Sequence, residues 1–480
     1  MKEDIQEIVN LIEQKRDKWI DISNQIWSFA ETRFTEHRSS ELLINTLEEE
    51  GFTVERGVAD MPTAFIASFG SGQPVVAILG EYDALSNLSQ QAGSTELNPV
   101  AVGGNGHGCG HNLLGTGSLA AAVALKDLME QEGIAGTVKY YGCPAEEGGS
   151  GKTYMARAGV FEGVDVAFCW HPWTDNLILP GKSLANIQAF FRFKGKSAHA
   201  AAQPHLGRSA LDAVELMNVG VNYLREHIIQ EARVHYAVTN TGGLAPNVVQ
   251  ENAEVLYLIR APQTDQVQDI YERVCNIARG AALMTDTQVE IVFDKACSNS
   301  IPNMTLSKKM WEVFNEIGVP TYTEEELTYA KNLQSTLSQE AIQSNLDTLP
   351  KAVASKVKVK PLSDILHPFS EAEVDKLLSG STDVGDVSWL VPTAQIGTSC
   401  WVLGTPAHTW QVVSIGATSI GQKGMLQAGK VIAGTALEAL KNSELIAKAK
   451  GELAERLDGR EYFCPIPDNI KPGQNEKAVQ

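Results

Sequence analysis

The spacing of hydrophobic residues predicts helices at the start of the chain and alternating strands and helices after it. Apolar residues recur at helical intervals over residues 5–50, and Gly51 is a typical residue to end the last of these helices. Apolar runs predict strands at 64–69 and 75–80. The second strand has no polar face and is therefore expected at the centre of a sheet. An Ala-rich stretch over 113–130 predicts a buried helix.

Two more strands continue this alternation, and each is followed by side chains that can bind a metal or transfer a proton. They are predicted at 137–141 and 164–168. Strands that alternate with helices form a largely parallel sheet with helices on its faces, and ligands bind beyond the carboxyl ends of its strands. The fold class predicted for this part of the chain is therefore an α/β/α sandwich.

The middle of the chain follows a different order, strand–helix–strand–strand–helix–strand. These elements are predicted at 184–193, 210–227, 233–239, 254–260, 266–283 and 288–294. This is the ferredoxin-like order. We therefore expect an inserted domain at 184–297, with residues 1–183 and 298–480 forming the other domain.

The last third of the chain has fewer clear signals. A helix is predicted at 311–314, and an Ala-rich stretch at about 422–441 is expected to be the final helix. No element is assigned to the long, mixed segment 322–380. The polar residues from Pro465 onward are expected to be frayed.

Composition and charge are those of a globular enzyme. Of the 480 residues, 43% are hydrophobic and 20% are charged. With 58 acidic against 39 basic residues, the net charge is -19, which argues against binding to nucleic acid or to anionic membranes. The start of the chain is acidic and lacks a signal-peptide pattern, and no apolar run is long enough to span a bilayer. The seven cysteines include no CxxC pair, so we expect reduced thiols and a cytoplasmic location.

Four short segments carry metal-ligating side chains near predicted strand ends. They are Gly108–His111, Glu146–Gly149, Trp170–Pro172 and Ala407–Thr409. Thiolate, imidazole and carboxylate groups gathered from separate segments are typical of a transition-metal hydrolytic site. The combination, rather than any one segment, favours this interpretation.

Each segment alone has a plainer interpretation. Cys109 and His111 lie in a glycine-rich turn, which on its own fits a structural loop with a buried thiol better than a metal site. His171 fits a buried core histidine equally well, and His408 alone is ambiguous. Asp83, at the end of the strand over 75–80, can orient His111, approach a metal or cap a following helix.

The adjacent carboxylates Glu146 and Glu147 are the most specific of these signals. Two neighbouring carboxylates repel each other, and a cation beside them relieves the repulsion. Glu147 is then a candidate ligand and Glu146 a candidate general base for a metal-activated water. An exposed acidic turn is the alternative, but Pro144 and Gly148 indicate a constrained turn.

Taken together, these residues resemble the co-catalytic metallopeptidases of the aminoacylase/carboxypeptidase G family. The similarity covers most of the chain and rests on Cys109, His111, Glu146, Glu147, His171, His408 and the segments 31–34, 195–200 and 242–247. The Cys-Gly-His sequence resembles the amidohydrolase branch that includes the indole-acetyl-amino-acid hydrolases. Segments 105–115 and 381–389 resemble members of that branch that act on p-aminobenzoyl-glutamate.

The resemblance implies an amide hydrolase with two divalent ions, manganese or zinc. The metal ligands it implies are Cys109, His111, Glu147, His171 and His408, with Glu146 as the general base. It further implies that residues 184–297 are a lid and dimerisation domain attached to a catalytic domain, and that His199 reaches a tetrahedral oxyanion across the dimer interface. Asn247 and Arg260 would hold the substrate carboxylate, for which a guanidinium is well suited. A homodimer, or a heteromer with a related A subunit, is implied as well.

One residue departs from the family pattern. Most of the branch has Asp where this chain has Asn112, and an amide supplies no negative charge, so we expect Asp83 to support His111 instead. The expected reaction is cleavage of p-aminobenzoyl-glutamate, a folate catabolite, to p-aminobenzoate and glutamate.

The sequence leaves other functions open. Indole-acetyl-aspartate or a dipeptide would present a similar amide next to a carboxylate. Two alternatives belong to other functional classes. The chain could be a weakly active regulatory subunit of a hydrolase complex, or a thiol hydrolase with Cys109 as nucleophile.

Overall fold

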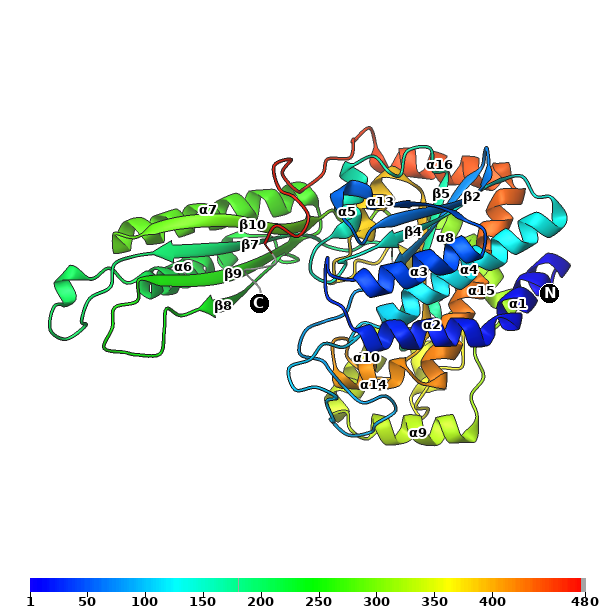
Figure 1. The fold of residues 1–480 in the computed structure, drawn as a ribbon, viewed down its shortest axis with the longest axis horizontal. Coiled ribbons are helices and arrows are strands. Elements are labelled where there is room, and N and C mark those ends of the chain that lie inside the picture. The colour runs from blue at the N-terminus through cyan, green and yellow to red at the C-terminus, as the bar shows by residue number, and fades with distance from the viewer. Residues whose placement is uncertain (180, 476–480) are drawn as a thin grey trace. The chain divides into compact units, whose positions relative to one another are not determined.

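The computed structural model describes residues 1–179 and 181–475, which pack as two units (Figure 1). The first unit comprises Met1–Lys182, Ile301–Lys376 and Val387–Tyr462. The second comprises Ser183–Ser300, Leu377–Asp386 and the described residues from Phe463 onward. Among the described residues, no helix is both long enough and apolar enough to cross a membrane.

A seven-stranded sheet forms the centre of the first unit, in the order β1-β2-β4-β3-β5-β11-β6. Its strands are β1 (Thr53–Arg56), β2 (Phe65–Ser71), β3 (Val75–Glu81), β4 (Gly136–Cys143), β5 (Val166–Trp173), β6 (Leu177–Ile178) and β11 (Thr393–Ser399). The strands β4, β3, β5 and β11 run parallel, and β2 and β6 pair antiparallel with the ends of this group. As predicted, the strand β3, which is apolar as far as Gly80, is central. Its residues Val76–Leu79 are buried on both faces.

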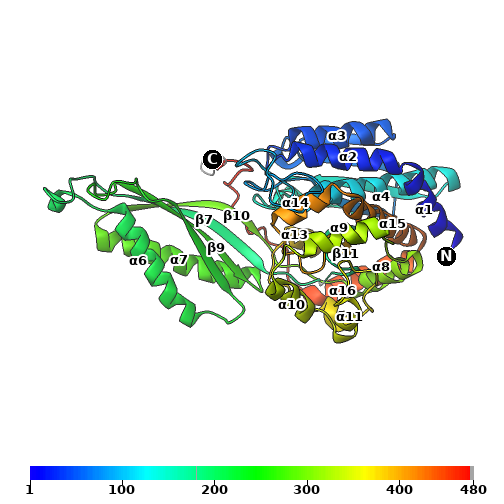
Figure 2. The ribbon, with the colours of Figure 1, turned by 90° about the horizontal axis from the view of Figure 1, so that it is seen from below.

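Two long helices, α4 (His111–Glu132) and α15 (Ser419–Lys441), pack against this sheet and against each other. Glycines permit their close approach, because a Cβ on Gly117 or on Gly429 would come within 3.0 Å of a backbone oxygen of the facing helix. The predicted helical region 5–50 is three helices, α1 (Glu3–Gln14), α2 (Arg16–Phe29) and α3 (His37–Glu49). Helices α1 and α2 contact α4, and α3 lies beside α2 (Figure 2).

The unassigned segment 322–380 contains four helices. They are α9 (Glu324–Gln334), α10 (Gln339–Thr348), α11 (Lys351–Val357) and α12 (Glu371–Val374). Thr323 and Glu326 form a reciprocal capping box at the start of α9, and Ser338 caps α10. These helices bury few residues, and α10 buries none. The capping residues Thr323 and Ser338 therefore indicate where α9 and α10 begin, which the hydrophobic pattern does not.

Two predicted boundaries are wrong. The strand expected to end at residue 168 continues to Trp173, because Trp170 is buried and β5 pairs with β11 from Ala167 to Trp173. The helix α15 is not the final one, because Asn442 caps a further helix, α16 (Ser443–Leu457). Outside Ser183–Ser300, the described residues also form the helices α5 (Gly151–Arg157), α8 (Met304–Ile317), α13 (Val384–Leu390) and α14 (Trp410–Gly416).

The second unit has the predicted strand–helix–strand–strand–helix–strand order. Its elements are β7 (Ala185–Lys194), α6 (Ala210–Leu224), β8 (Arg233–Asn240), β9 (Asn252–Ala261), α7 (Thr264–Thr285) and β10 (Gln288–Cys297). The strands form an antiparallel sheet in the order β10-β7-β9-β8. In β9, Tyr257 is buried and its hydroxyl donates to Asn218 of α6, whereas Arg260 lies on the opposite, partly exposed face.

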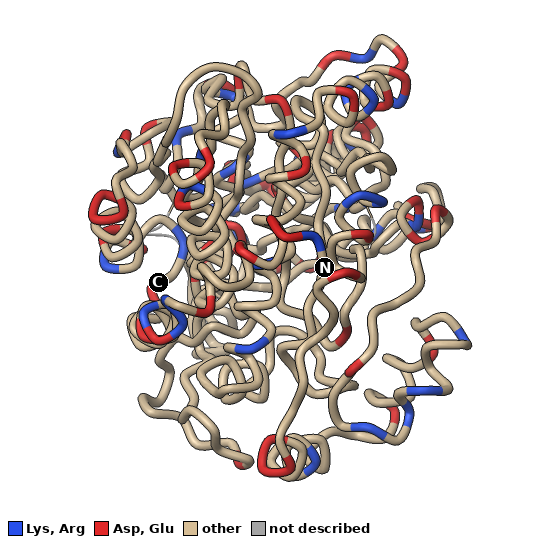
Figure 3. Tube along the Cα trace, turned by 90° about the vertical axis from the view of Figure 1, so that its right-hand side faces the viewer, with Lys and Arg blue, Asp and Glu red and all other residues tan. Residues whose placement is uncertain are grey.

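The α/β sandwich with an inserted ferredoxin-like unit confirms the predicted fold class. Acidic and basic residues are interspersed along the side of the molecule that Figure 3 shows, within a chain of net charge -19.

Candidate metal centre

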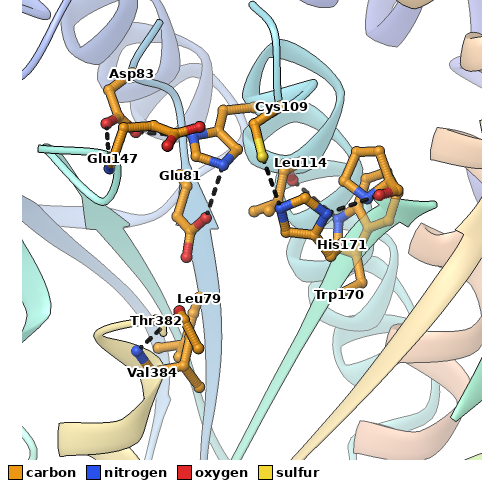
Figure 4. Close-up of polar contacts among 12 residues, drawn as sticks. Leu79, Glu81, Asp83, Cys109, Leu114, Glu147, Trp170, His171, Thr382 and Val384 are labelled. Atoms are coloured by element: carbon orange, nitrogen blue, oxygen red, sulfur yellow. Dashed lines mark hydrogen bonds and ion pairs between the residues drawn. The ribbon is translucent and has the colours of Figure 1, made fainter. Parts of the chain in front are cut away.

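The predicted ligands of the first unit lie together at the carboxyl ends of its parallel strands. Glu147 follows β4, and His171 lies within β5 rather than after it. Cys109 and His111 lie at the start of α4, and His408 lies in the loop before α14. Figure 4 shows the Cys109 sulfur directed at the His171 ring, with Asp83 and Glu147 close by. Sγ of Cys109 lies 3.4 Å from Nε2 of His171.

The five side chains form two overlapping groups, and Cys109 belongs to both. In one group, ligand atoms of Cys109, His111 and His171 all lie within 4.8 Å of one another. In the other, the same holds for Cys109, Glu147 and His408. Sulfur, nitrogen and oxygen donors in such groups suit transition metals. The thiol of Cys109 is therefore shared by two candidate ligand groups.

The environment of His111 fits a metal ligand. Nδ1 of His111 lies 2.9 Å from Oδ1 of Asp83, whereas Nε2 is buried and makes no hydrogen bond. Oε2 of Glu81 lies 3.4 Å from this nitrogen, and a bound cation would give it the partner that no hydrogen bond supplies. The other oxygen of Asp83 accepts a hydrogen bond of 2.9 Å from the backbone N–H of Glu147. Asp83 therefore orients His111, as expected, and no helix begins there for it to cap.

The pKa values at the site depend on burial and on neighbouring charges. Burial, followed by the charge of His111, lowers the pKa of His171 to about 4, which keeps its imidazole neutral and able to bind a metal. Burial opposes ionisation of Glu147, but the hydrogen bond with His408 and the charge of His111 outweigh it and lower its pKa to about 2. Burial, and then the charge of Glu147, raises the pKa of Cys109. A cation beside the sulfur would reverse that shift.

The backbone around Cys109 explains why glycines flank it. Gly110 has a φ of +74° and begins α4 in the left-handed conformation. A Cβ on Gly108 would lie 2.5 Å from Leu88 and 3.3 Å from Cα of His408. The N–H of His408 donates to the carbonyl of Gly108 over 2.8 Å. This close approach joins the His408 loop to the start of α4.

Sequence reasoning missed a buried ion pair at the same place. Nζ of Lys152, in α5, lies 2.7 Å from Oε1 of Glu81, and both side chains are buried. Oε2 of Glu81 lies 3.4 Å from Nε2 of His111. Ligand atoms of Glu81, His111 and Glu146 also form a group within 4.8 Å of one another. The available signal was the spacing of Glu81 and Asp83, because residues two apart at a strand end share a side.

Asn112, the departure from the family pattern, does not serve the site. Its amide nitrogen donates to Oγ of Ser23 over 3.1 Å and to the carbonyl of Gly416 over 3.3 Å. Asn112 therefore connects helices, and the carboxylate behind His111 is that of Asp83.

The other three predicted residues lie in the second unit. Nδ1 of His199 accepts hydrogen bonds from the N–H groups of Ala201 and Ala202, so its Nε2 carries the proton. Asn247 is exposed, and its carbonyl accepts from the N–H of Ala200 over 2.9 Å, beside His199. Arg260 is half-buried, and its Nη1 lies 3.4 Å from Oγ of Ser381. His199 and Asn247 are thus neighbours.

Replacing Asp83 with Asn is expected to weaken metal binding about 10- to 100-fold, because His111 loses the negative charge that orients and polarises it. Competition with a chelating dye measures the affinity. Asp127→Asn, on α4 but paired with Lys15, is the control and should bind metal as the wild type does. Equal affinities for the two variants would contradict a role for Asp83.

The chain is similar in sequence and in fold to several known proteins. The chain is 52% identical to the B subunit of p-aminobenzoyl-glutamate hydrolase from Escherichia coli (strain K12), over 98% of this chain and 99% of the relative. It is 30% identical to the Xaa-Arg dipeptidase of Mus musculus, over 91% of this chain and 89% of that protein. Its fold is similar to the crystal structure of the aminobenzoyl-glutamate utilization protein from Klebsiella pneumoniae, with a TM-score of 0.56 and 17% identity. That match covers 89% of this chain and 97% of the other.

The profile of one protein family spans both the first ligand segment and the inserted unit. It matches residues 77–384, more than half of the chain. Together with the relatives above, this match shows that the chain belongs to peptidase family M20/M25/M40 and is a metal-dependent amide hydrolase.

Proposed function

We propose that this protein cleaves the amide bond of p-aminobenzoyl-glutamate, releasing p-aminobenzoate and glutamate. The observation that carries the proposal is the pair of ligand groups that share Cys109, with Glu146 beside them. The name of the Escherichia coli relative, 52% identical over 98% of this chain, supports this choice of substrate. Other N-acyl amino acids, such as indole-acetyl-aspartate or a dipeptide, are the substrates to compare with it.

Two divalent cations, manganese or zinc, would bind at the two ligand groups that share Cys109. Cys109, His111 and His171 would hold one cation, and Cys109, Glu147 and His408 the other. Bound cations of this kind activate water and polarise a carbonyl group. The residues supply neutral imidazole, carboxylate and sulfur, which are the donors that such cations take.

Glu146 would act as the general base. It follows β4, is half-exposed, and lies in the group with Glu81 and His111. Its carboxylate would take a proton from the attacking water and return it to the leaving amine. The raised pKa of Cys109 argues against a thiolate nucleophile in the absence of metal, whereas a bound cation would itself stabilise the thiolate as a ligand.

Residues of the second unit would bind the substrate. Nε2–H of His199 is a free donor in the tautomer described above and would stabilise the oxyanion across a dimer interface. Asn247 and Arg260 would hold the substrate carboxylate, Arg260 through its fork of N–H donors. We propose a homodimer or a heteromer with a related A subunit, on the grounds that the Escherichia coli relative is itself named as one subunit of a hydrolase. The seven free cysteines support a cytoplasmic location.

Release of p-aminobenzoate by the purified chain tests this proposal. The chain is assayed with p-aminobenzoyl-glutamate alone, with added manganese or zinc, and after chelation. We expect turnover that chelation abolishes and added metal restores. Activity that appears only with a second subunit would favour a regulatory role for this chain. Turnover that survives complete removal of metal would contradict the proposal.

A further inference from the structure

A group of positive side chains lies on the open face of the sheet in the second unit. Arg233 of β8 and Arg260 of β9 are directly opposite partners, so their side chains point to the same face. Asn186 of β7 is the partner of Arg260 on its other side. His235, two residues after Arg233, lies on that face as well. Three adjacent strands thus contribute to one polar group.

The charges in this group act on one another. Burial, and then the charge of Arg260, lowers the pKa of His235. The charges of Arg225 and Arg233 act on His235 in the same direction. Directly opposite residues on adjacent strands have Cβ atoms about 4.5–5.5 Å apart, and like charges there are destabilising. A bound anion would remove this repulsion.

Protein carboxylates do not neutralise Arg225 or Arg233. Within residues 1–179 and 181–475, neither forms an ion pair, although the chain has 58 acidic residues. Nη1 of Arg233 donates to the carbonyls of Gln230 and Ala232, which fixes its position. Its Nε and Nη2 make no hydrogen bond with a described residue, so an N–H fork is held in place and remains available.

We propose that Arg233, together with His235, binds a second carboxylate of the substrate next to the one that Arg260 binds. The ligand class is an N-acyl amino acid with an acidic side chain, such as glutamate or aspartate. This inference rests on the proposed function, in which Arg260 takes the α-carboxylate. Arg233 is then a specificity-determining residue, because it distinguishes a dicarboxylic amino acid from a monocarboxylic one.

The experiment compares p-aminobenzoyl-glutamate with p-aminobenzoyl-alanine, which lacks the second carboxylate. In Arg233→Gln we expect KM for the glutamate compound to rise about 10- to 100-fold, as for a lost charged hydrogen bond, with kcat within about twofold. Kinetics with the alanine compound should not change. Arg192→Gln is the matched control, because Arg192 lies on the same sheet but pairs with Glu254 over 2.6 Å. It should leave the preference for glutamate intact.

Two results would overturn the inference while leaving the proposed function in place. In the first, the wild type hydrolyses p-aminobenzoyl-glutamate and p-aminobenzoyl-alanine with equal kcat/KM. In the second, Arg233→Gln prefers the glutamate compound as strongly as the wild type does. If the wild type hydrolyses neither compound, the proposed function fails. Calorimetric titration with glutarate then decides the inference, because binding that Arg233→Gln weakens would support it and equal binding by both proteins would overturn it.

Discussion

Replacing Glu146 with Gln is expected to lower kcat by about 10²- to 10⁴-fold, because the attacking water loses the group that accepts its proton. Gln keeps the shape of the side chain but has no basic oxygen. The metal content should not change, since the two groups that share Cys109 do not include Glu146. Steady-state kinetics and elemental analysis on the same preparation measure both quantities.

The control for this variant is Glu132→Gln, at the far end of α4, where Glu132 pairs with Lys441 at the surface. It should have wild-type activity. A Glu146→Gln enzyme that keeps most of its activity would remove Glu146 from the mechanism. A variant that loses its metal would show instead that Glu146 is a ligand.

Replacing Lys152 with Met is expected to lower the free energy of unfolding by about 3–5 kcal/mol, because it removes the ammonium group that lies 2.7 Å from the buried carboxylate of Glu81. Breaking an ion pair on one side is costly when the remaining charge has no access to water. Urea denaturation of metal-free protein measures the change and separates it from effects of metal binding.

Two further variants make this test specific. Lys448→Met removes a lysine that pairs with Glu444 at the surface, with side-chain exposures of 65% and 77%, and should cost at most about 1 kcal/mol. The double variant Lys152→Met/Glu81→Leu removes both buried charges and should recover much of the lost stability. Similar losses for Lys152→Met and Lys448→Met would contradict a stabilising role for the buried pair.

The parts of the fold that sequence could predict are those in which one apolar pattern dominates. Strand β3 is apolar on both faces, and its central place follows from that alone. The extension of β5 to Trp173 was missed, because it depends on pairing with β11, which lies more than 200 residues away in sequence. Helices α9 and α10 were missed because they bury few residues and begin at capping side chains, which a hydrophobic pattern does not show.

In the site, too, residues could be recognised from their own sequence segments, whereas roles that depend on contacts distant in sequence could not. Side chains with metal chemistry in tight turns, such as Cys109 and Glu147, could be selected from the sequence, and the structure brings them together. From the sequence, Asp83 could orient His111, approach a metal or cap a helix. Its contacts with Nδ1 of His111 and with the backbone N–H of Glu147 show that it orients His111. Lys152 gave no comparable signal, because its burial beside Glu81 depends on how α5 packs.

The number of metal ions per chain tests the central claim most directly, namely that one thiol lies between two metal sites. Elemental analysis after equilibration with manganese or zinc and removal of the excess gives this number. We expect two ions for the wild type and a loss of both high-affinity sites in Cys109→Ala, because Cys109 belongs to both ligand groups. A Cys109→Ala protein that still holds two ions, or a wild type that holds none, would contradict it.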